Sequence, residues 1–283
     1  MSPKIHVEDL ASLSREIVAE IDVLPMFPDN IVYLQKLVSD PDSELSDIAR
    51  QISMDPSLTA ELLKLVNSAS FMLQKRVDNI VEAVKMAGMK RLNLILYQYG
   101  TEVLLPKGQK SLWDHSYQAA FYAYSLARYF LKRKDILDDV YVGGILHDMG
   151  KIIFSSVHPE LLEKIERFAQ RREIDRDLFE DLSVGLNHSE IGALIAEKWN
   201  FPEVLTAAIR HHHEPETASS DFSSVVNTVY LANALCDIER KALVYEQVDT
   251  ATLEEFNITS ERQLDQIHAR LKRAFDQDRA GTD

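Results

Sequence analysis

The octet Gly144–Lys151 (GILHDMGK) places two groups that could bind a metal, His147 and Asp148, side by side after an apolar run. A buried imidazole–carboxylate pair costs free energy unless another group satisfies it. Imidazole nitrogen and carboxylate oxygen are both good ligands for a divalent metal, so a bound ion would provide that compensation. The octet alone fits two interpretations equally well. The first is a metal site; the second is a buried histidine whose hydrogen bonds are satisfied, beside a carboxylate at a helix end.

Six of the nine histidines are candidate ligands; all six lie in the second half of the chain, and each group of them sits on or beside a different predicted helix. These six are His115, His147, His188, His211, His212 and His213. Histidines from separate helices commonly build a metal centre inside a helical bundle. Their spacings are too long to be diagnostic, and capping of helix ends or packing against aromatic rings is the competing interpretation. His6, His158 and His268 look incidental, and His268 is expected to face solvent.

Four residues carry open alternatives of their own: His212, His213, Lys151 and Asn233. His212 and His213 are adjacent, and adjacent side chains rarely point the same way on a regular helix. They can do so at a helix end, which Pro215 predicts here. The alternative is that both lie in an exposed polar turn. Lys151 could meet a phosphate as a point charge, or could be a surface charge. Asn233 could hydrogen-bond a metal ligand, or could be an ordinary buried amide. The sequence has no G-x-S-x-G motif, glycine-rich phosphate loop or cysteine zinc pattern, so hydrolysis through serine or cysteine has no support.

The composition indicates a helical protein with a substantial core. Of 283 residues, 46% are apolar, and glycine and proline number only 9 each, which favours helices over a turn-rich β fold. The net charge of −14 argues against nucleic acid and anionic membranes as partners. A single cysteine, the lack of a visible signal peptide and the lack of an apolar run of roughly 20 residues predict a cytoplasmic protein.

The elements that must position these residues can be predicted from their capping and breaking signals. Pro25 and Pro28 interrupt the chain before the first core helix, and Asp55-Pro56 and Asn79 start later helices. The two helices predicted within 45–67 have the lengths and spacing of a helix-turn-helix motif. The second offers only Lys64 as a cation, so a packed scaffold is the better interpretation than DNA recognition.

Residues 106–108 (PKG) form the best candidate boundary, which predicts an N-terminal helical subdomain, 1–105, and a C-terminal subdomain with the metal site, 106–283. In the second, we expect long helices over 112–131, 181–199 and 223–238, and a further helix over 159–172. No stretch of the sequence has the pattern of a β-strand.

The chain resembles the HDOD family, helical modules of bacterial signalling proteins related to the HD-domain phosphohydrolases. The resemblance covers roughly residues 24–237. The motifs that carry it are LPMFP (24–28), DPSL (55–58), LVNSAS (65–70) and IVEAVKMAGMKRL (80–92). It implies an all-α, multi-helix HDOD/HD-domain bundle.

By the same resemblance, and by similarity to the HD-GYP branch of the HD superfamily in particular, this chain keeps metal-binding residues that HDOD proteins often lack. The implied ligands are His115, His147, Asp148, His188, His212 and His213, with Lys151 as the lysine after the namesake pair. They imply one or two divalent ions, with Fe, Mn, Ni or Zn all compatible with nitrogen and oxygen ligands. In the catalytic interpretation, Asp148 bridges two ions and Lys151 neutralises a phosphate.

Two departures from the family pattern bear on activity. The final ligand of the pattern is an aspartate, and Asn233 stands at that position here; an amide is a weaker, uncharged ligand. The GYP segment typical of cyclic di-nucleotide phosphodiesterases is missing after His213.

These departures favour a regulatory protein that binds a signalling partner or a small phosphate-containing ligand. The alternative is a working metal-dependent phosphohydrolase or phosphodiesterase that acts on a nucleotide or another phosphoester.

Overall fold

A computed structural model describes residue 19 and residues 21–22, 24–67, 77–104, 110–151 and 187–280. The described part is helical and contains no strand, which confirms the predicted all-α class. Two predicted stretches, the helix over 159–172 and the start of the helix over 181–199, lie outside the described residues. No helix of the described part is long and apolar enough to cross a membrane.

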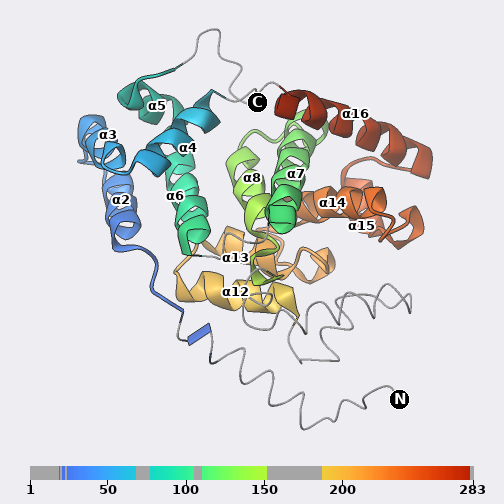
Figure 1. Ribbon diagram of the computed structural model, residues 1–283. Helices are drawn as coiled ribbons and strands as arrows, with labels where there is room; N and C mark the ends of the chain where they lie inside the picture. Colours follow the sequence, from blue (N-terminus) through green and yellow to red (C-terminus); the bar gives the residue numbers. More distant parts are fainter. Residues whose placement is uncertain are drawn as a thin grey trace.

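The first half forms a group of short helices at one side of the molecule (Figure 1). The helices are α2 (Asp29–Ser39), α3 (Leu45–Ser53), α4 (Pro56–Val66), α5 (Ile80–Ala87) and α6 (Met89–Leu104). The predicted starts of α4 and α5 are confirmed. The side chain of Asp55 accepts hydrogen bonds from the amides of the first turn of α4, and Asn79 does the same for α5.

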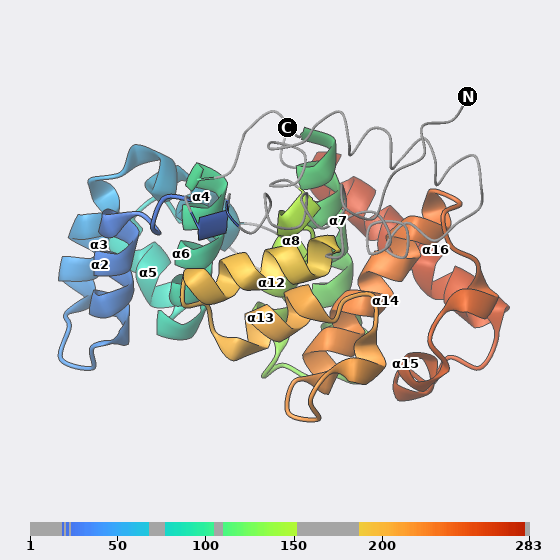
Figure 2. The same ribbon diagram turned by 90° about the horizontal axis from the view of Figure 1, so that it is seen from below.

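The second half contributes the long central helices and a covering pair. Its α-helices are α7 (Lys110–Leu126), α8 (Leu137–Leu146), α12 (His188–Lys198), α13 (Glu203–Arg210), α14 (Ser223–Glu239), α15 (Thr250–Glu255) and α16 (Glu261–Ala280). The helix predicted over 112–131 is continuous, but its last turn, Ala127–Leu131, is π-helical. Helices α12 and α13 lie across one end of α8 (Figures 1 and 2).

The buried core crosses the boundary predicted at residues 106–108. One hydrophobic cluster joins α2–α6 to α8, α12 and α13, and a second joins α7 and α8 to α14, α15 and α16. Helix α8 contributes to both clusters and contacts α6, α7, α13 and α14. The division into subdomains 1–105 and 106–283 stays a prediction, and α8 is the element on which both groups of helices pack.

Ion pairs and an aromatic cluster connect the first half to the elements that carry the histidines. Arg91 and Lys90 of α6 pair with Asp138 and Asp139 in the first turn of α8, where negative charge also favours the helix dipole. Phe27, in the LPMFP motif, packs against Tyr97, Trp199 and Phe201 with ring centroids 5.6–6.1 Å away. The motif therefore holds the end of α12 against α6.

Candidate metal centre

Helix α8 delivers His147 and Asp148 into the interior. Eight of its ten residues are buried, and the chain continues from its end directly into the two polar residues. At Gly144 the helix approaches α7 so closely that a Cβ would lie 2.6 Å from the Cα of Ala120. This approach brings α8 beside the helix that carries His115, so a costly polar pair is buried next to a third potential ligand.

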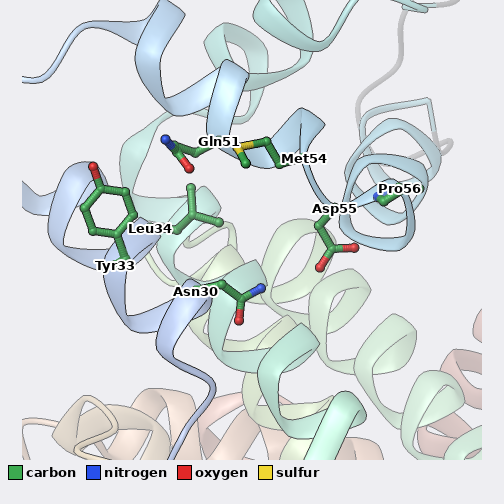
Figure 3. Close-up of a pocket in the computed structure, with 7 residues that line it drawn as sticks. All are labelled: Asn30, Tyr33, Leu34, Gln51, Met54, Asp55 and Pro56. Atoms are coloured by element: carbon green, nitrogen blue, oxygen red, sulfur yellow. The ribbon is translucent and has the colours of Figure 1, made fainter.

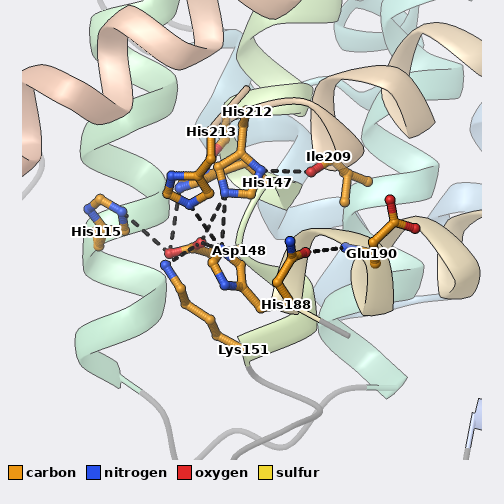
Figure 4. Close-up of polar contacts among 11 residues, drawn as sticks. His115, His147, Asp148, Lys151, His188, Glu190, Ile209, His212 and His213 are labelled. Atoms are coloured by element: carbon orange, nitrogen blue, oxygen red, sulfur yellow. Dashed lines mark hydrogen bonds and ion pairs between the residues drawn. The ribbon is translucent and has the colours of Figure 1, made fainter. Parts of the chain in front are cut away.

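The carboxylate of Asp148 lies between two groups of imidazoles (Figure 4). Its Oδ2 atom is 3.4 Å from Nε2 of His115 and 3.5 Å from Nε2 of His147. Its Oδ1 atom is 3.4 Å from Nε2 of His188 and 3.6 Å from Nε2 of His212. All five side chains are buried. The carboxylate thus offers one oxygen to each group.

The hydrogen bonds of two histidines fix which ring nitrogen carries the proton. Nδ1 of His147 donates to the backbone oxygen of Gly144 at 2.7 Å, and Nδ1 of His212 donates to that of Ile209 at 2.7 Å. In the neutral ring, Nε2 then carries a lone pair, and in both residues that lone pair faces the carboxylate oxygen of Asp148. Two acceptors that face each other need a cation between them, so these residues fit a bound metal.

The second group contains three imidazoles, those of His188, His212 and His213. Nε2 of His188 lies 3.2 Å from Nε2 of His212 and 3.1 Å from Nε2 of His213. Together with Asp148, these three residues have ligand atoms within 4.8 Å of one another, as have His115, His147 and Asp148. The structure therefore offers two ligand groups that share one carboxylate, which is the arrangement that two neighbouring ions require.

His211, the remaining member of the triplet, stays outside the site. It ends α13, and its Nδ1 lies 2.6 Å from the hydroxyl of Thr217. His268 differs from expectation, because its ring is largely buried near Tyr122 and 3.4 Å from the carboxylate of Glu239. His268 lies on α16, which packs against α7. Because of this packing, the side of α16 that carries His268 does not face solvent.

A close backbone approach positions His188. A Cβ at Gly150 would overlap the backbone oxygen of His188 and the amide of Gly192, so only glycine lets α12 pack on the end of α8. The side chain of Asn187 caps α12 by accepting from the amide of Glu190 at 2.9 Å. The first residue of α12 is therefore held beside Asp148.

Burial and charge keep the site in the ionisation state that binds metals. Burial lowers the pKa of His147 to about 4 and that of His212 well below its usual value. Burial alone raises the pKa of Asp148, but the ammonium of Lys151 and the surrounding imidazoles more than offset this and hold it well below the usual range. Lys151 lies with its Nζ 2.8 Å from Oδ1 of Asp148. At neutral pH the imidazoles of His147 and His212 are therefore neutral and the carboxylate of Asp148 is charged.

Helix α14, which packs against α7 and α8, carries two more polar residues. Asn233 is buried, and no group of the described residues donates a hydrogen bond to its Oδ1. Asp237, one turn later, did not follow from the sequence as a site residue, although its spacing of four residues places it on the same face as Asn233. Burial raises the pKa of the Asp237 carboxyl, and the ammonium of Lys151 partly offsets that effect.

A separate pocket of about 360 Å³ lies between α2 and the turn from α3 to α4, lined by Asn30, Tyr33, Leu34, Gln51, Met54, Asp55 and Pro56 (Figure 3). Its one charged group is Asp55, which already accepts from two amides of α4 and from the hydroxyl of Tyr99 at 2.9 and 3.0 Å. The only charged side chain that lines this pocket therefore already has its hydrogen-bond partners, and the candidate site is the centre around Asp148.

Comparison with known proteins identifies the family. The model of the HDOD domain matches residues 24–215. The chain belongs to the HDOD family. A relative from Treponema pallidum (strain Nichols), named "Uncharacterized protein", is 34% identical over 267 residues. The match covers 93% of this chain, which spans about half, 52%, of the relative's length.

Solved structures share the HDOD fold over nearly the whole chain. An HDOD domain protein of unknown function from Geobacter sulfurreducens has a TM-score of 0.74 at 23% identity, covering 98% of each chain. A protein from Shewanella amazonensis SB2B, named "Putative phosphohydrolase", has a TM-score of 0.70 at 24% identity, covering 93% of this chain and 95% of its own. At these identities the likeness shows the fold alone.

Proposed function

We propose that this HDOD chain is a metal-dependent phosphohydrolase that acts on a phosphoester. One observation carries the proposal: each oxygen of Asp148 faces a separate group of imidazoles, and in each group the lone pair of at least one Nε2 is directed at that carboxylate. Such a cluster is costly as a purely structural feature, because buried acceptors oppose one another. It gains its compensation from cations.

The ligands divide into two sets. His115, His147 and Asp148 would hold one ion, and His188, His212 and His213 would hold the second with the same carboxylate. Mixed nitrogen and oxygen ligands suit Fe, Mn, Ni or Zn. When bound, two such metal ions would supply a Lewis acid for phosphoryl oxygens and lower the pKa of a water molecule.

The residues of the chain itself provide orientation, charge and exclusion of water. The backbone oxygens of Gly144 and Ile209 hold two imidazoles in one tautomer and one orientation. Lys151 is buried beside Asp148, so its ammonium can neutralise one charge of a phosphate that reaches the centre. The absence of a GYP segment from the sequence directs the proposal away from cyclic di-nucleotides.

A second candidate function is a regulatory one, in which the centre binds a phosphate-containing ligand without turning it over and the chain signals to a protein partner. Asn233 favours it, because an amide stands where the family pattern has its last charged ligand. The carbonyl oxygen of Asn233 receives no hydrogen bond from the described residues, so the position is open to a ligand of either kind.

Hydrolysis of a phosphoester panel by untagged protein loaded with Mn²⁺, Fe²⁺, Ni²⁺ or Zn²⁺ separates the two functions. We expect turnover of at least one phosphomonoester or phosphodiester, and a loss of about 10³-fold or more in Asp148→Asn and His147→Ala, because the shared carboxylate and a ligand are removed. Binding of a phosphoester without turnover, with activity gained only in Asn233→Asp, would support the regulatory function and contradict the enzyme.

A further inference from the structure

The carboxylate of Asp148 is paired with a cation of the chain itself, the ammonium of Lys151. The Nζ atom of Lys151 lies 2.8 Å from Oδ1 of Asp148, and only 8% of the lysine side chain is exposed. Figure 4 shows the end of this side chain directed at the carboxylate. The backbone amide of Lys151 also donates to the backbone oxygen of Asp148 at 2.9 Å, so one turn of the chain holds both charged groups.

The ion pair involves only one of the two oxygens that the proposed ions would bind. The contacts of Oδ2 are with Nε2 of His115 and His147, whereas Oδ1, the atom that Lys151 contacts, faces Nε2 of His188 and His212 at 3.4 and 3.6 Å. The two groups of ligands are therefore not equivalent. We call them the first set (His115, His147 and Oδ2 of Asp148) and the second set (Oδ1 of Asp148, His188, His212 and His213).

An ion in the second set would share an oxygen atom with the ammonium. Divalent metals bind carboxylate oxygens at about 2.1 Å. Because Nζ of Lys151 is 2.8 Å from the same oxygen, the ion and the ammonium could be at most about 5 Å apart. Both carry positive charge, and Asp148, His188 and His212 are buried, so little water screens the repulsion. Binding of an ion by the second set therefore favours departure of the ammonium from Oδ1.

An ion in the first set would not compete with Lys151 for its oxygen. Oδ2 lies 3.4 Å from Nε2 of His115 and 3.5 Å from Nε2 of His147. The lysine can also move, because its stem has four rotatable carbons and, among the described residues, its ammonium pairs with no carboxylate other than Asp148. The first set can thus fill while the ion pair is intact, and the second set can fill only against it.

We propose that Lys151 orders the loading of the centre: its ammonium competes with the ion of the second set for Oδ1 of Asp148, so that the first set fills first and the second ion releases the ammonium. The inference rests on the proposed function, because it concerns the same centre. The released ammonium remains three residues from Asp148, where it can meet a phosphate. One lysine therefore has two partners in succession, the carboxylate and then the phosphoester.

Titration of the chelator-stripped, untagged chain with Mn²⁺, followed by the electron paramagnetic resonance signal of free Mn²⁺, tests this order without any activity. For the wild type we expect two binding steps, the second at least about tenfold weaker than the first. Lys151→Met keeps a long unbranched side chain and removes the charge. It should tighten the second step by about tenfold or more and change the first by less than about threefold.

Two further lysine variants serve as controls. Lys151→Arg keeps the positive charge and should leave the second step weak. Lys64→Met removes the same charge from an exposed position on α4 and should leave both steps as they are in the wild type. Lys151→Gln replaces Lys151→Met where the latter does not fold.

Variants that keep only one set assign the two steps. His188→Ala removes the central ligand of the second set, and His115→Ala removes a ligand of the first. Lys151→Met should tighten the remaining ion by about tenfold in the His115→Ala background and by less than about threefold in the His188→Ala background, because only the second set shares its oxygen with the ammonium. A crystal structure of the fully loaded wild type should show Nζ of Lys151 more than about 4 Å from Oδ1.

The outcomes separate the inference from the function on which it rests. Two equal steps in the wild type, or a Lys151→Met variant in which both steps tighten equally or the second weakens, would show that the competition is wrong while the centre stands. An ion bound by the second set with Nζ still 2.8 Å from Oδ1 would also contradict it. If the wild type binds no Mn²⁺, the centre itself is wrong.

Discussion

The backbone oxygens of Gly144 and Ile209 decide what the central histidines can do. Each accepts a hydrogen bond from the Nδ1–H of one imidazole and leaves the Nε2 lone pair directed at Asp148. A histidine that served only to satisfy the buried carboxylate would direct a proton at it instead. At the scale of single residues, the two interpretations left open by the adjacent pair His147-Asp148 are therefore distinguished by a tautomer, which the sequence does not specify.

Acidification should destabilise the chelator-stripped protein between about pH 6.5 and 4. Burial lowers the folded-state pKa of His147 to about 4, below the unfolded value of 6.5, so in this window the unfolded chain binds a proton that the folded chain does not. The stability is fully present above pH 6.5 and is lost as the pH falls, with a slope of up to about 1.4 kcal/mol per pH unit for each such histidine.

Urea unfolding of the stripped protein at several pH values measures this slope. His147→Gln should reduce it, because the titrating group is removed. Asp148 adds to the dependence only toward the acid end of this window and below it, because its folded-state pKa lies below the usual value of 3.8 and its contribution is lost as the unfolded carboxyl becomes protonated. A free energy of unfolding that does not change between pH 6.5 and 4 would show that the buried imidazoles are not neutral.

At the scale of helices, the sequence predicts local starts well and close approaches poorly. Asp55-Pro56 and Asn79 were sufficient to predict where α4 and α5 begin, because a cap is satisfied within its own turn. The meeting of His188 with Asp148 depends on the approach of α12 to Gly150, 38 residues earlier, and no local signal encodes it. The resemblance to a family supplied that convergence, whereas spacing alone left it open.

Gly150→Ala should separate α12 from α8. The added methyl would overlap backbone atoms of His188 and Gly192, which cannot rotate away, so we expect a loss of about 3 kcal/mol in stability and a loss of metal binding. Gly143→Ala is the control within the same segment. Its methyl would lie 3.1 Å from the Cβ of Ala208, so the neighbouring helix would have to shift by only a few tenths of an ångström, and the change should cost about 1 kcal/mol.

Urea midpoints and Mn²⁺ titration of the two variants check this prediction. Equal stability of Gly150→Ala and the wild type, with metal binding intact, would mean that α12 does not pack on the end of α8 as described.

At the scale of the whole molecule, the first half acts as a support for the centre. The core that contains α2–α6 also contains residues of α8, α12 and α13, which carry or flank the ligands. Lys198 at the end of α12 donates to the backbone oxygens of Ile21, Asp22 and Leu24, at 2.6–3.0 Å. The N-terminal segment and the LPMFP motif therefore hold the helix that begins with His188.

Phe27→Ala should weaken this support. The ring is buried at 4% exposure among Tyr97, Trp199 and Phe201, and its loss should cost about 3–5 kcal/mol. The neighbouring side chain of Met26 is 66% exposed, and Met26→Ala should change the stability by less than about 0.5 kcal/mol.

Because the core is continuous, we expect the fluorescence of the two tryptophans, Trp113 and Trp199, and the circular dichroism signal to lose their native values in one transition in both variants. Two separate transitions, or a Phe27→Ala midpoint equal to that of Met26→Ala, would contradict a shared core.

The metal content of untagged protein, measured after loading with Mn²⁺, Fe²⁺, Ni²⁺ or Zn²⁺ and removal of free ions, tests the central claim most directly. The two ligand groups around Asp148 predict about two ions per chain for the best metal, and fewer than about 0.2 per chain in Asp148→Ala, because that variant removes the carboxylate both groups share. A wild-type content below about one ion in ten chains with every metal would contradict the centre and, with it, the proposed hydrolase.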